Sequence, residues 1–210
     1  MSFMIKADPR RHWLMSAFEP FANREKNNSL QVLEEIKKLT LEVRPSEKGP
    51  FQFHYLVLPV EYETCFQILK DETLKLQKNG INLEGILALG EGAEEFKIET
   101  QANNLDDVPE VPDNKGETRS AHKIFAEYSE EHLLPLRFPF EAFSRIRSSK
   151  NPGYYICNHL CAKMSYHFGK TNEIPYFGFI HVPQTGSGGV FTPDVCATVI
   201  LNSFKKIKTF

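Results

Sequence analysis

The chain has 210 residues, 41% of them hydrophobic, and a formal net charge of −2. This composition predicts one globular domain, and the near-zero net charge gives no indication of binding to nucleic acid or an anionic membrane. No apolar run approaches the roughly 20 residues of a membrane-spanning helix, so we expect neither nucleic acid nor a membrane as a partner.

The opening residues, 1–12, lack the apolar core of a signal peptide and are expected to form a loose leader to a single domain over 13–210. The four cysteines do not have the spacing of a disulfide framework. Without an export signal, such cysteines indicate a reducing compartment, and a cytoplasmic location is therefore predicted.

Predicted strands and helices alternate in the first part of the chain. Three apolar runs predict strands, over 13–18, 51–58 and 85–89. Two amphipathic runs predict helices, over 29–39 and 61–79. Ser29 is expected to cap the first helix, and Asn79 and Gly80 to end the second. This order of elements implies a parallel sheet with right-handed crossovers.

The pattern is less regular up to residue 150 and then becomes clear again. The middle segments predict a loop at 90–92, a strand at 96–102, a polar loop at 103–116, and helical turns at 121–128 and 141–147. The last segments predict a helix at 154–168, a strand at 175–182, and a helix with Thr192 as N-cap and Pro193 in its first turn. The whole pattern predicts an α/β domain with a mostly parallel central sheet.

Cys157 is the first candidate for chemistry. It falls in the first turn of the helix that follows Pro152 and Gly153. Unpaired N–H groups and the positive end of the helix dipole lie there, and both favour a thiolate. Gly153 is expected to let a substrate approach the backbone just before the cysteine. The alternative is that Cys157 is a small apolar residue in a buried helix, as many free cysteines are.

His181 and Glu99 are the next candidates. His181 lies near the end of an otherwise apolar strand, where active sites collect in open α/β sheets. Glu99 follows the glycine-containing exit of the third predicted strand. With Cys157 they predict a thiol nucleophile, an imidazole base and a carboxylate that orients the base. The alternatives are a core histidine with backbone partners and an exposed surface carboxylate.

The same helix gives little support to a metal site. His159 lies between Cys157 and Cys161 in the chain, but on a helix it points away from the face that the two cysteines share. No second pair of ligands lies nearby in the sequence. We therefore expect neither a metal ion nor a cofactor.

Several segments also resemble a known family. The two most specific are G-Y-Y-I-C-N at 153–158 and G-F-I-H-V-P at 178–183. The others are A-F-E-P-F at 17–21 with N-N-S at 27–29, L-P-V at 58–60, E-T-Q-A-N-N at 99–104 and P-D-N-K-G at 112–116. In this order they resemble the pyroglutamyl peptidase I family, the pyrrolidone-carboxylate peptidases. The match extends over most of the chain and is poor over 117–150.

The resemblance implies a three-layer α/β/α sandwich and a cysteine peptidase. By it, the nucleophile is Cys157, the base is His181 and the acidic partner is Glu99. Phe18 and Phe21 match the family's ring-binding aromatic residues, since aromatic faces can enclose a flat, neutral lactam. The implied reaction is hydrolysis of the amide bond after an N-terminal pyroglutamyl or related blocked residue, through a thioester. The expected partner is therefore a peptide or small amide with a blocked N-terminus.

The chain also departs from the family's pattern around the expected pocket. Ala22 and Asn23 replace two glycines, the loop at 90–95 lacks an arginine, Thr100 replaces another arginine, and Asn151 and Pro152 replace small residues. A second hypothesis is therefore a catalytically silent relative that binds a small ligand or a partner. A third is a redox-sensitive thiol with Cys161 as the resolving cysteine. A homo-oligomer is also left open.

Overall fold

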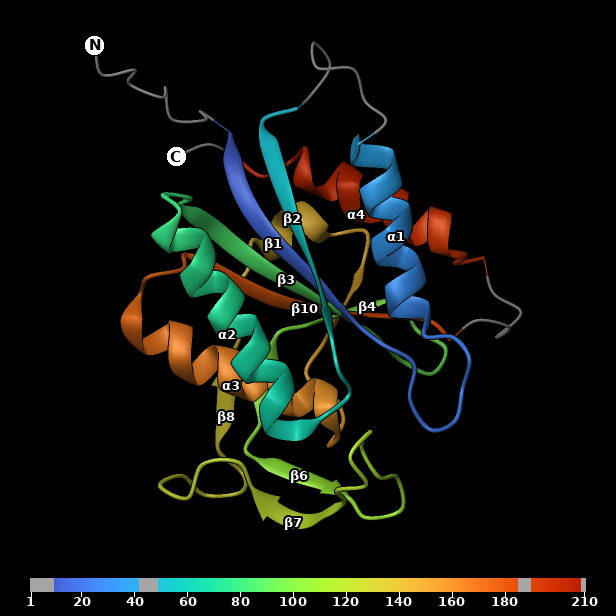
Figure 1. The fold of residues 1–210 in the computed structure, drawn as a ribbon, viewed down its shortest axis with the longest axis vertical. Coiled ribbons are helices and arrows are strands. Elements are labelled where there is room, and N and C mark those ends of the chain that lie inside the picture. Colours follow the sequence, from blue (N-terminus) through green and yellow to red (C-terminus); the bar gives the residue numbers. More distant parts are fainter. Residues whose placement is uncertain (1–9, 42–48, 185–189, 209–210) are drawn as a thin grey trace.

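The computed structural model describes residues 10–41, 49–184 and 190–208. Within them, a six-stranded sheet with the order β2-β1-β3-β10-β4-β9 forms the centre of the molecule (Figure 1). Its strands are β1 (Arg11–Phe18), β2 (Phe51–Leu58), β3 (Leu83–Glu91), β4 (Lys97–Glu99), β9 (Arg147–Ser149) and β10 (Tyr176–Val182). The first four strands of that order are mutually parallel, and β4 is antiparallel to β10. The predicted mostly parallel sheet is confirmed.

Helices cover both faces of this sheet (Figure 1). They are α1 (Asn28–Leu41) and α4 (Pro193–Phe204) on one face, and α2 (Tyr62–Lys78) and α3 (Ile156–Thr171) on the other. Alternate residues of each strand point to opposite faces, so Trp13 belongs to the core under α1 and α4, and Leu14 to the core under α2 and α3. The three-layer α/β/α arrangement is confirmed.

Two strands are longer than predicted. β1 begins at Arg11. The Arg11 side chain pairs with Glu84 and donates to the Ile207 carbonyl at 3.2 Å, and these contacts hold the residue against the sheet. Part of the predicted leader therefore belongs to the sheet, and residues 1–9 lie outside the described residues. β3 continues through Gly90 and Glu91, which pair with β10, so the predicted loop starts only after them.

The predicted cap of α1 was wrong. The helix begins at Asn28, and the side-chain oxygen of Asn27 accepts the N–H of Ser29 at 3.0 Å. The Ser29 hydroxyl instead accepts the Phe18 N–H at 3.2 Å and so ties α1 to the end of β1. The predicted N-cap position of Thr192 before α4 is confirmed, although its side chain makes no cap hydrogen bond.

The middle segment differs most from prediction. The predicted loop at 103–116 contains β6 (Leu105–Val108), and the predicted helix at 121–128 is wrong, because β7 (Arg119–Lys123) pairs with β6 there. The buried side chain of Asn104 explains why the residues after β7 do not form a helix either. Its amide donates to the carbonyl groups of Phe125 and Ser129, each at 3.0 Å, and holds this segment as turns. The predicted strand at 96–102 divides at Thr100 into β4 and β5 (Gln101–Asn103), and β5 pairs with β8 (Leu133–Pro135).

One short helical element completes the fold. The helical turn predicted at 141–147 is a single 3-10 turn, η2 (Phe140–Phe143). It packs its buried Phe143 against Phe204 of α4, with ring centroids 5.4 Å apart. None of the helices in the described part of the chain has the length and apolarity needed to cross a membrane.

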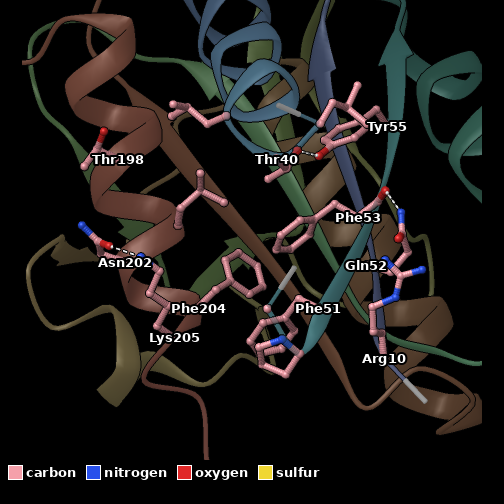
Figure 2. A pocket seen from close by; sticks show the side chains of 15 residues that line it. Arg10, Thr40, Phe51, Gln52, Phe53, Tyr55, Thr198, Asn202, Phe204 and Lys205 are labelled. Atoms are coloured by element: carbon pink, nitrogen blue, oxygen red, sulfur yellow. Dashed lines mark hydrogen bonds between the residues drawn. The ribbon is translucent and has the colours of Figure 1, made fainter. Parts of the chain in front are cut away.

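An aromatic cavity of about 430 Å³ opens on the α1 and α4 side of the sheet (Figure 2). Its floor consists of Phe51, Phe53 and Phe204, and Thr40 and Tyr55 lie at one end. Every predicted site residue lies outside its lining. The residues predicted for chemistry lie instead around the carboxyl ends of the parallel strands.

Candidate active site

The carboxyl ends of β1, β3 and β10 lie at one edge of the sheet, as parallel pairing requires. Cys157 reaches this edge from the first turn of α3, as predicted. A Cβ atom placed on Gly90 of β3 would lie 2.8 Å from the Cys157 sulfur. The sulfur therefore packs directly on the Gly90 backbone, and any side chain at this position would collide with it.

His181 and Glu99 are hydrogen-bonded partners on neighbouring strands. The Nδ1 atom of His181 lies 2.9 Å from a carboxylate oxygen of Glu99, and the two side chains are 6% and 0% exposed. The antiparallel register of β10 and β4 makes them diagonal neighbours on one face. The Lys97 ammonium lies 3.4 Å from the same carboxylate oxygen. The predicted imidazole–carboxylate pair is thus present and buried.

This environment keeps Glu99 ionised. Burial raises the pKa of Glu99, but hydrogen bonds with His181 and Ser149 and the charges of His181 and Lys97 outweigh it, so the pKa is lowered overall. An ionised carboxylate accepts the Nδ1 proton of the imidazole. The Nε2 atom of His181 is then the proton acceptor of the ring.

His181 and Cys157 border the same glycine-rich segment. In the sheet His181 pairs with Gly90, the residue on which the cysteine sulfur packs. A Cβ atom on Gly92 would lie 3.2 Å from the Cβ of His181. Glycine at positions 90 and 92 therefore leaves room for the thiol and the imidazole at one strand end.

The structure does not favour the thiolate that was predicted for Cys157. Burial, followed by the carboxylates of Glu99 and Glu91, raises the pKa of the Cys157 thiol to about 12, and Lys97 only partly opposes this. The start of α3 does favour a thiolate, but two nearby carboxylates and the loss of water outweigh that effect. Cys157 is therefore a neutral thiol in the resting site.

Gly153 is needed for its backbone conformation. Its φ of 83° lies in the left-handed region, which lets the chain turn sharply into α3. A Cβ atom there would meet no other atom within 4 Å, so the space beside this residue is open. The side-chain amide of Asn103 donates to the Gly153 carbonyl at 3.3 Å and holds the turn in place.

The two predicted ring-binding phenylalanines differ in exposure. Phe18 is 2% exposed and packs on Phe179, with ring centroids 6.5 Å apart. Phe21 is half-buried, and its ring lies 6.0 Å from that of Tyr155. Phe21 also lines a pocket of about 290 Å³. Tyr155 was missed from sequence, although its place two residues before Cys157 could have indicated it.

Arg24 and Asn158 were also missed. The guanidinium of Arg24 lies 5.6 Å from the Phe21 ring and pairs with Glu91. The buried side chain of Asn158 accepts the Asn103 N–H at 2.8 Å and donates to the Leu105 carbonyl at 2.8 Å. Asn158 therefore fastens the first turn of α3 to the strands beside it, which fixes the position of the cysteine before it.

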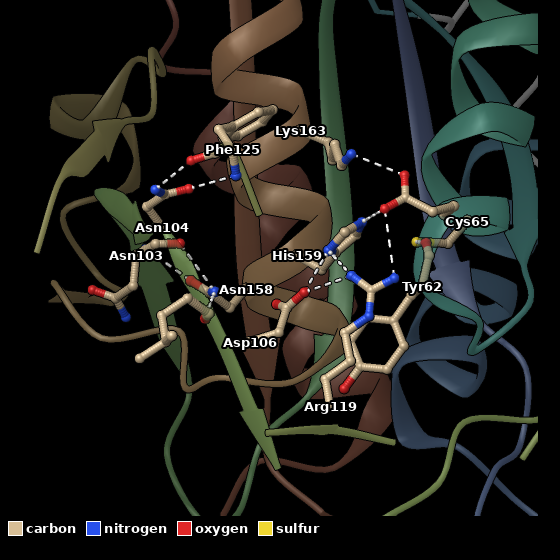
Figure 3. A network of polar contacts seen from close by, with 12 residues as sticks. Tyr62, Cys65, Asn103, Asn104, Asp106, Arg119, Phe125, Asn158, His159 and Lys163 are labelled. Carbon is tan, nitrogen blue, oxygen red and sulfur yellow. Dashed lines mark hydrogen bonds and ion pairs between the residues drawn. The ribbon is translucent and has the colours of Figure 1, made fainter. Parts of the chain in front are cut away.

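A second buried polar network lies further along α3 (Figure 3). His159 Nδ1 is 2.7 Å from a carboxylate oxygen of Asp106, and Arg119 donates to the same oxygen at 2.9 Å. Glu63 joins the network through His159 at 3.5 Å and Arg119 at 3.6 Å, and Lys163 pairs with its other carboxylate oxygen at 2.8 Å. The network ties β6 and β7 to α2 and α3. Within the ranges that the structure describes, no group of three or more His, Cys, Asp or Glu side chains could hold a metal ion.

Comparison with known proteins places the chain in a family. The model of the pyroglutamyl peptidase family matches residues 11–204, and the chain belongs to this family. Pyrrolidone-carboxylate peptidase 1 of Caldanaerobacter subterraneus subsp. tengcongensis is 24% identical over 204 residues, which cover 93% of this chain and 94% of the relative. A pyrrolidone-carboxylate peptidase of Staphylococcus saprophyticus is 28% identical over 178 residues, which cover 81% of this chain and 77% of the relative.

Solved structures show the same fold. The crystal structure of pyroglutamyl peptidase I from Bacillus amyloliquefaciens superimposes with a TM-score of 0.76 at 20% identity, covering 92% of this chain and 93% of that one. Pyrrolidone carboxyl peptidase from Thermococcus litoralis gives a TM-score of 0.74 at 23% identity, covering 93% and 92%. At such identities the likeness establishes the fold.

Proposed function

We propose that this chain is a cysteine peptidase that hydrolyses the amide bond after an N-terminal pyroglutamyl or related blocked residue. One observation carries the proposal: the buried His181–Glu99 pair stands at the strand end where the Cys157 sulfur packs on Gly90. Membership of the pyroglutamyl peptidase family supports the substrate class. Cys157 is the nucleophile, His181 the general base and Glu99 the residue that orients it.

The proposed reaction starts from a neutral thiol. The Cys157 sulfur attacks the carbonyl carbon while its proton passes to Nε2 of His181. Glu99 holds the Nδ1 proton and stabilises the imidazolium that forms. The N–H groups in the first turn of α3 stabilise the oxyanion.

The second half of the reaction releases both products. His181 returns its proton to the leaving amine, the carbon–nitrogen bond breaks, and a thioester on Cys157 remains. Water then attacks the thioester with His181 as base. Pyroglutamate leaves as the free acid, and the thiol is regenerated.

The proposed binding site for the acyl group is aromatic on one side and open on the other. Phe21 and Tyr155 offer faces to a flat lactam ring, and Phe18 belongs to the buried cluster on which both pack. Gly153 leaves space beside the backbone. A free ammonium group would lose its hydration in such a site, so we expect discrimination against unblocked N-termini.

The two other hypotheses receive less support. The comparisons give none to a catalytically silent relative, because both the family model and the similar structures are peptidases. A disulfide between Cys157 and Cys161 would need to distort α3. Cβ atoms four residues apart on a helix are roughly 5–6 Å apart, whereas a disulfide holds them at about 3.8 Å.

The direct test is hydrolysis of a fluorogenic pyroglutamyl amide under reducing conditions. Wild type should hydrolyse it and should discriminate against the glutamyl and glutaminyl amides, which carry a free ammonium group. Cys157→Ala should be inactive. Cys196→Ala is the matched control, since it removes a buried thiol from the opposite side of the sheet and should keep the activity. Hydrolysis by Cys157→Ala equal to that of wild type would refute the proposal.

We further propose that the predicted domain, which β1 extends back to Arg11, folds as one unit and that the protein works in the cytoplasm. Limited proteolysis should give one resistant fragment, and cell fractionation should recover the protein with cytoplasmic markers. Whether subunits associate is a separate question, which sedimentation of the purified protein answers.

A further inference from the structure

Glu91 is a buried carboxylate one residue from the glycine on which the nucleophile packs. It is the last residue of β3, its side chain is 3% exposed, and it directly follows Gly90, against which the Cys157 sulfur packs. Its side chain points to the α1 side of the sheet, where the Asn28 N–H donates to one carboxylate oxygen at 2.6 Å. Because water is excluded, its negative charge is poorly screened from the sulfur.

Arg24 neutralises this carboxylate. Its guanidinium pairs with the other oxygen of Glu91, and its side chain is 31% exposed. The guanidinium also lies 5.6 Å from the ring of Phe21 and lines the same pocket. Arg24 therefore links Glu91 to Phe21, an aromatic residue of the proposed acyl site. The Asn28 N–H, at the positive end of α1, is the second neutralising contact.

The charges that act on the thiol come from three strands, and one of them, Glu91, lies on the other face of the sheet. β4 supplies Glu99 and Lys97, β10 supplies His181, and β3 supplies Glu91. Cys65 of α2 and Cys161 of α3 are buried thiols with raised pKa values and therefore carry no charge. Glu99 is balanced by His181 and Lys97, whereas the only described side chain paired with Glu91 is that of Arg24.

We propose that Arg24 is a positioning residue of this site: by neutralising Glu91, it sets how readily Cys157 loses its proton and attacks. This inference rests on the proposed function, in which Cys157 is the nucleophile. An unpaired Glu91 would repel the developing thiolate and hold the thiol in its inactive form. Removing Glu91 instead would leave the Arg24 cation to favour the thiolate.

The test is the pH dependence of Cys157 alkylation by iodoacetamide, followed by mass spectrometry of the peptide that contains Cys157. This measurement needs no substrate, so it stays informative even if the chain does not hydrolyse pyroglutamyl amides. Arg24→Gln should slow alkylation about tenfold at a given pH, the equivalent of one pKa unit. Glu91→Gln should accelerate it, and the double variant should return close to wild type.

Two controls separate this effect from a general loss of structure. Arg24→Lys keeps the charge and should restore most of the wild-type profile. Arg11→Gln breaks the Arg11–Glu84 pair, which involves the opposite end of the same strand β3, and should leave the profile unchanged.

The proposal is overturned if Arg24→Gln alkylates with the wild-type profile, if Glu91→Gln slows the reaction, or if the double variant is as slow as Arg24→Gln alone. It is also overturned if Arg11→Gln shifts the profile as far as Arg24→Gln does.

Discussion

Two buried histidine–carboxylate pairs lie within the described part of the chain, and their local geometry is almost the same. His181 and Glu99 are 2.9 Å apart, and His159 and Asp106 are 2.7 Å apart. Each pair is nearly excluded from solvent, with side-chain exposures of 6% and 0% for the first and 0% for both members of the second. Distance and burial alone therefore do not distinguish a pair that does chemistry from one that stabilises the fold.

The surroundings of the two pairs differ. His181 stands at the carboxyl end of a strand, beside glycines that make room for the Cys157 sulfur. The Asp106 carboxylate also binds Arg119, and Nε2 of His159 lies 3.5 Å from Glu63 (Figure 3). The second pair is thus enclosed by charged partners. We infer that an imidazole is available for catalysis here only where charged side chains do not surround its second nitrogen.

The largest expected effect is on the first pair. His181→Gln should lower kcat/KM for a pyroglutamyl amide by about 10³-fold, because the general base is lost. Its free energy of unfolding should stay within about 1 kcal/mol of wild type, since the substitution is close in size. Steady-state kinetics and urea unfolding of the same preparations measure both. Retention of most of the activity would mean that another group takes the proton.

The opposite result is expected for the second pair. Asp106→Ala should lower the free energy of unfolding by about 3 kcal/mol, because it leaves the buried Arg119 without a main partner. Activity of the folded fraction should change by only a few fold. Urea denaturation tests this, with Asp107→Ala on the exposed side of the same strand as the matched control. Equal destabilisation by both variants would contradict the structural role of this pair.

The raised thiol pKa predicts a distinctive pH profile for wild type. Only the thiolate is alkylated, and the pKa of Cys157 is about 12. The thiolate fraction, and with it the rate, should therefore rise about tenfold per pH unit throughout the neutral and mildly alkaline range. The alkylation rate of Cys157 with iodoacetamide checks this. A plateau near neutral pH would show that the site holds a preformed thiolate.

The smallest effect is expected at the exposed end of the second network. The hydrogen bond with His159 lowers the pKa of Glu63 more than burial raises it. Ionised Glu63 therefore stabilises the fold above the pKa it has in the unfolded chain, and this stabilisation is lost as the pH falls through its pKa in the folded protein. The Glu63 side chain is 61% exposed, and solvent screens most of this effect. Glu63→Gln should therefore change the unfolding free energy at neutral pH by less than about 1 kcal/mol. A loss as large as that of Asp106→Ala would show that the network depends on Glu63.

The regular elements could be predicted from sequence because their signals are local. The strand over 51–58 was predicted with its observed bounds, and Cys157 was placed in the first turn of its helix. The helix predicted over 121–128 failed because the Asn104 side chain, about twenty residues away, holds that segment as turns. Such a contact leaves no periodic pattern in the chain.

The chemistry of the site was only partly predictable for the same reason. The pairing of His181 with Glu99 joins residues that are far apart in the chain. Their places near the ends of predicted strands suggested the pair and the family resemblance supported it, but neither gave its geometry. The neutral state of the Cys157 thiol depends on Glu91 and Glu99, which approach it only in the folded sheet. Tyr155 was missed because an aromatic residue before a buried helix is also typical of a core.

The most direct test of the central claim is to trap the acyl group on the enzyme. Wild type is mixed with a pyroglutamyl amide and quenched in acid within one turnover, and the peptides are then analysed by mass spectrometry. The account predicts a pyroglutamyl thioester on Cys157, which is absent from His181→Gln at the same time point. A pyroglutamyl group on another residue, or release of the product without any acylated cysteine, would contradict it.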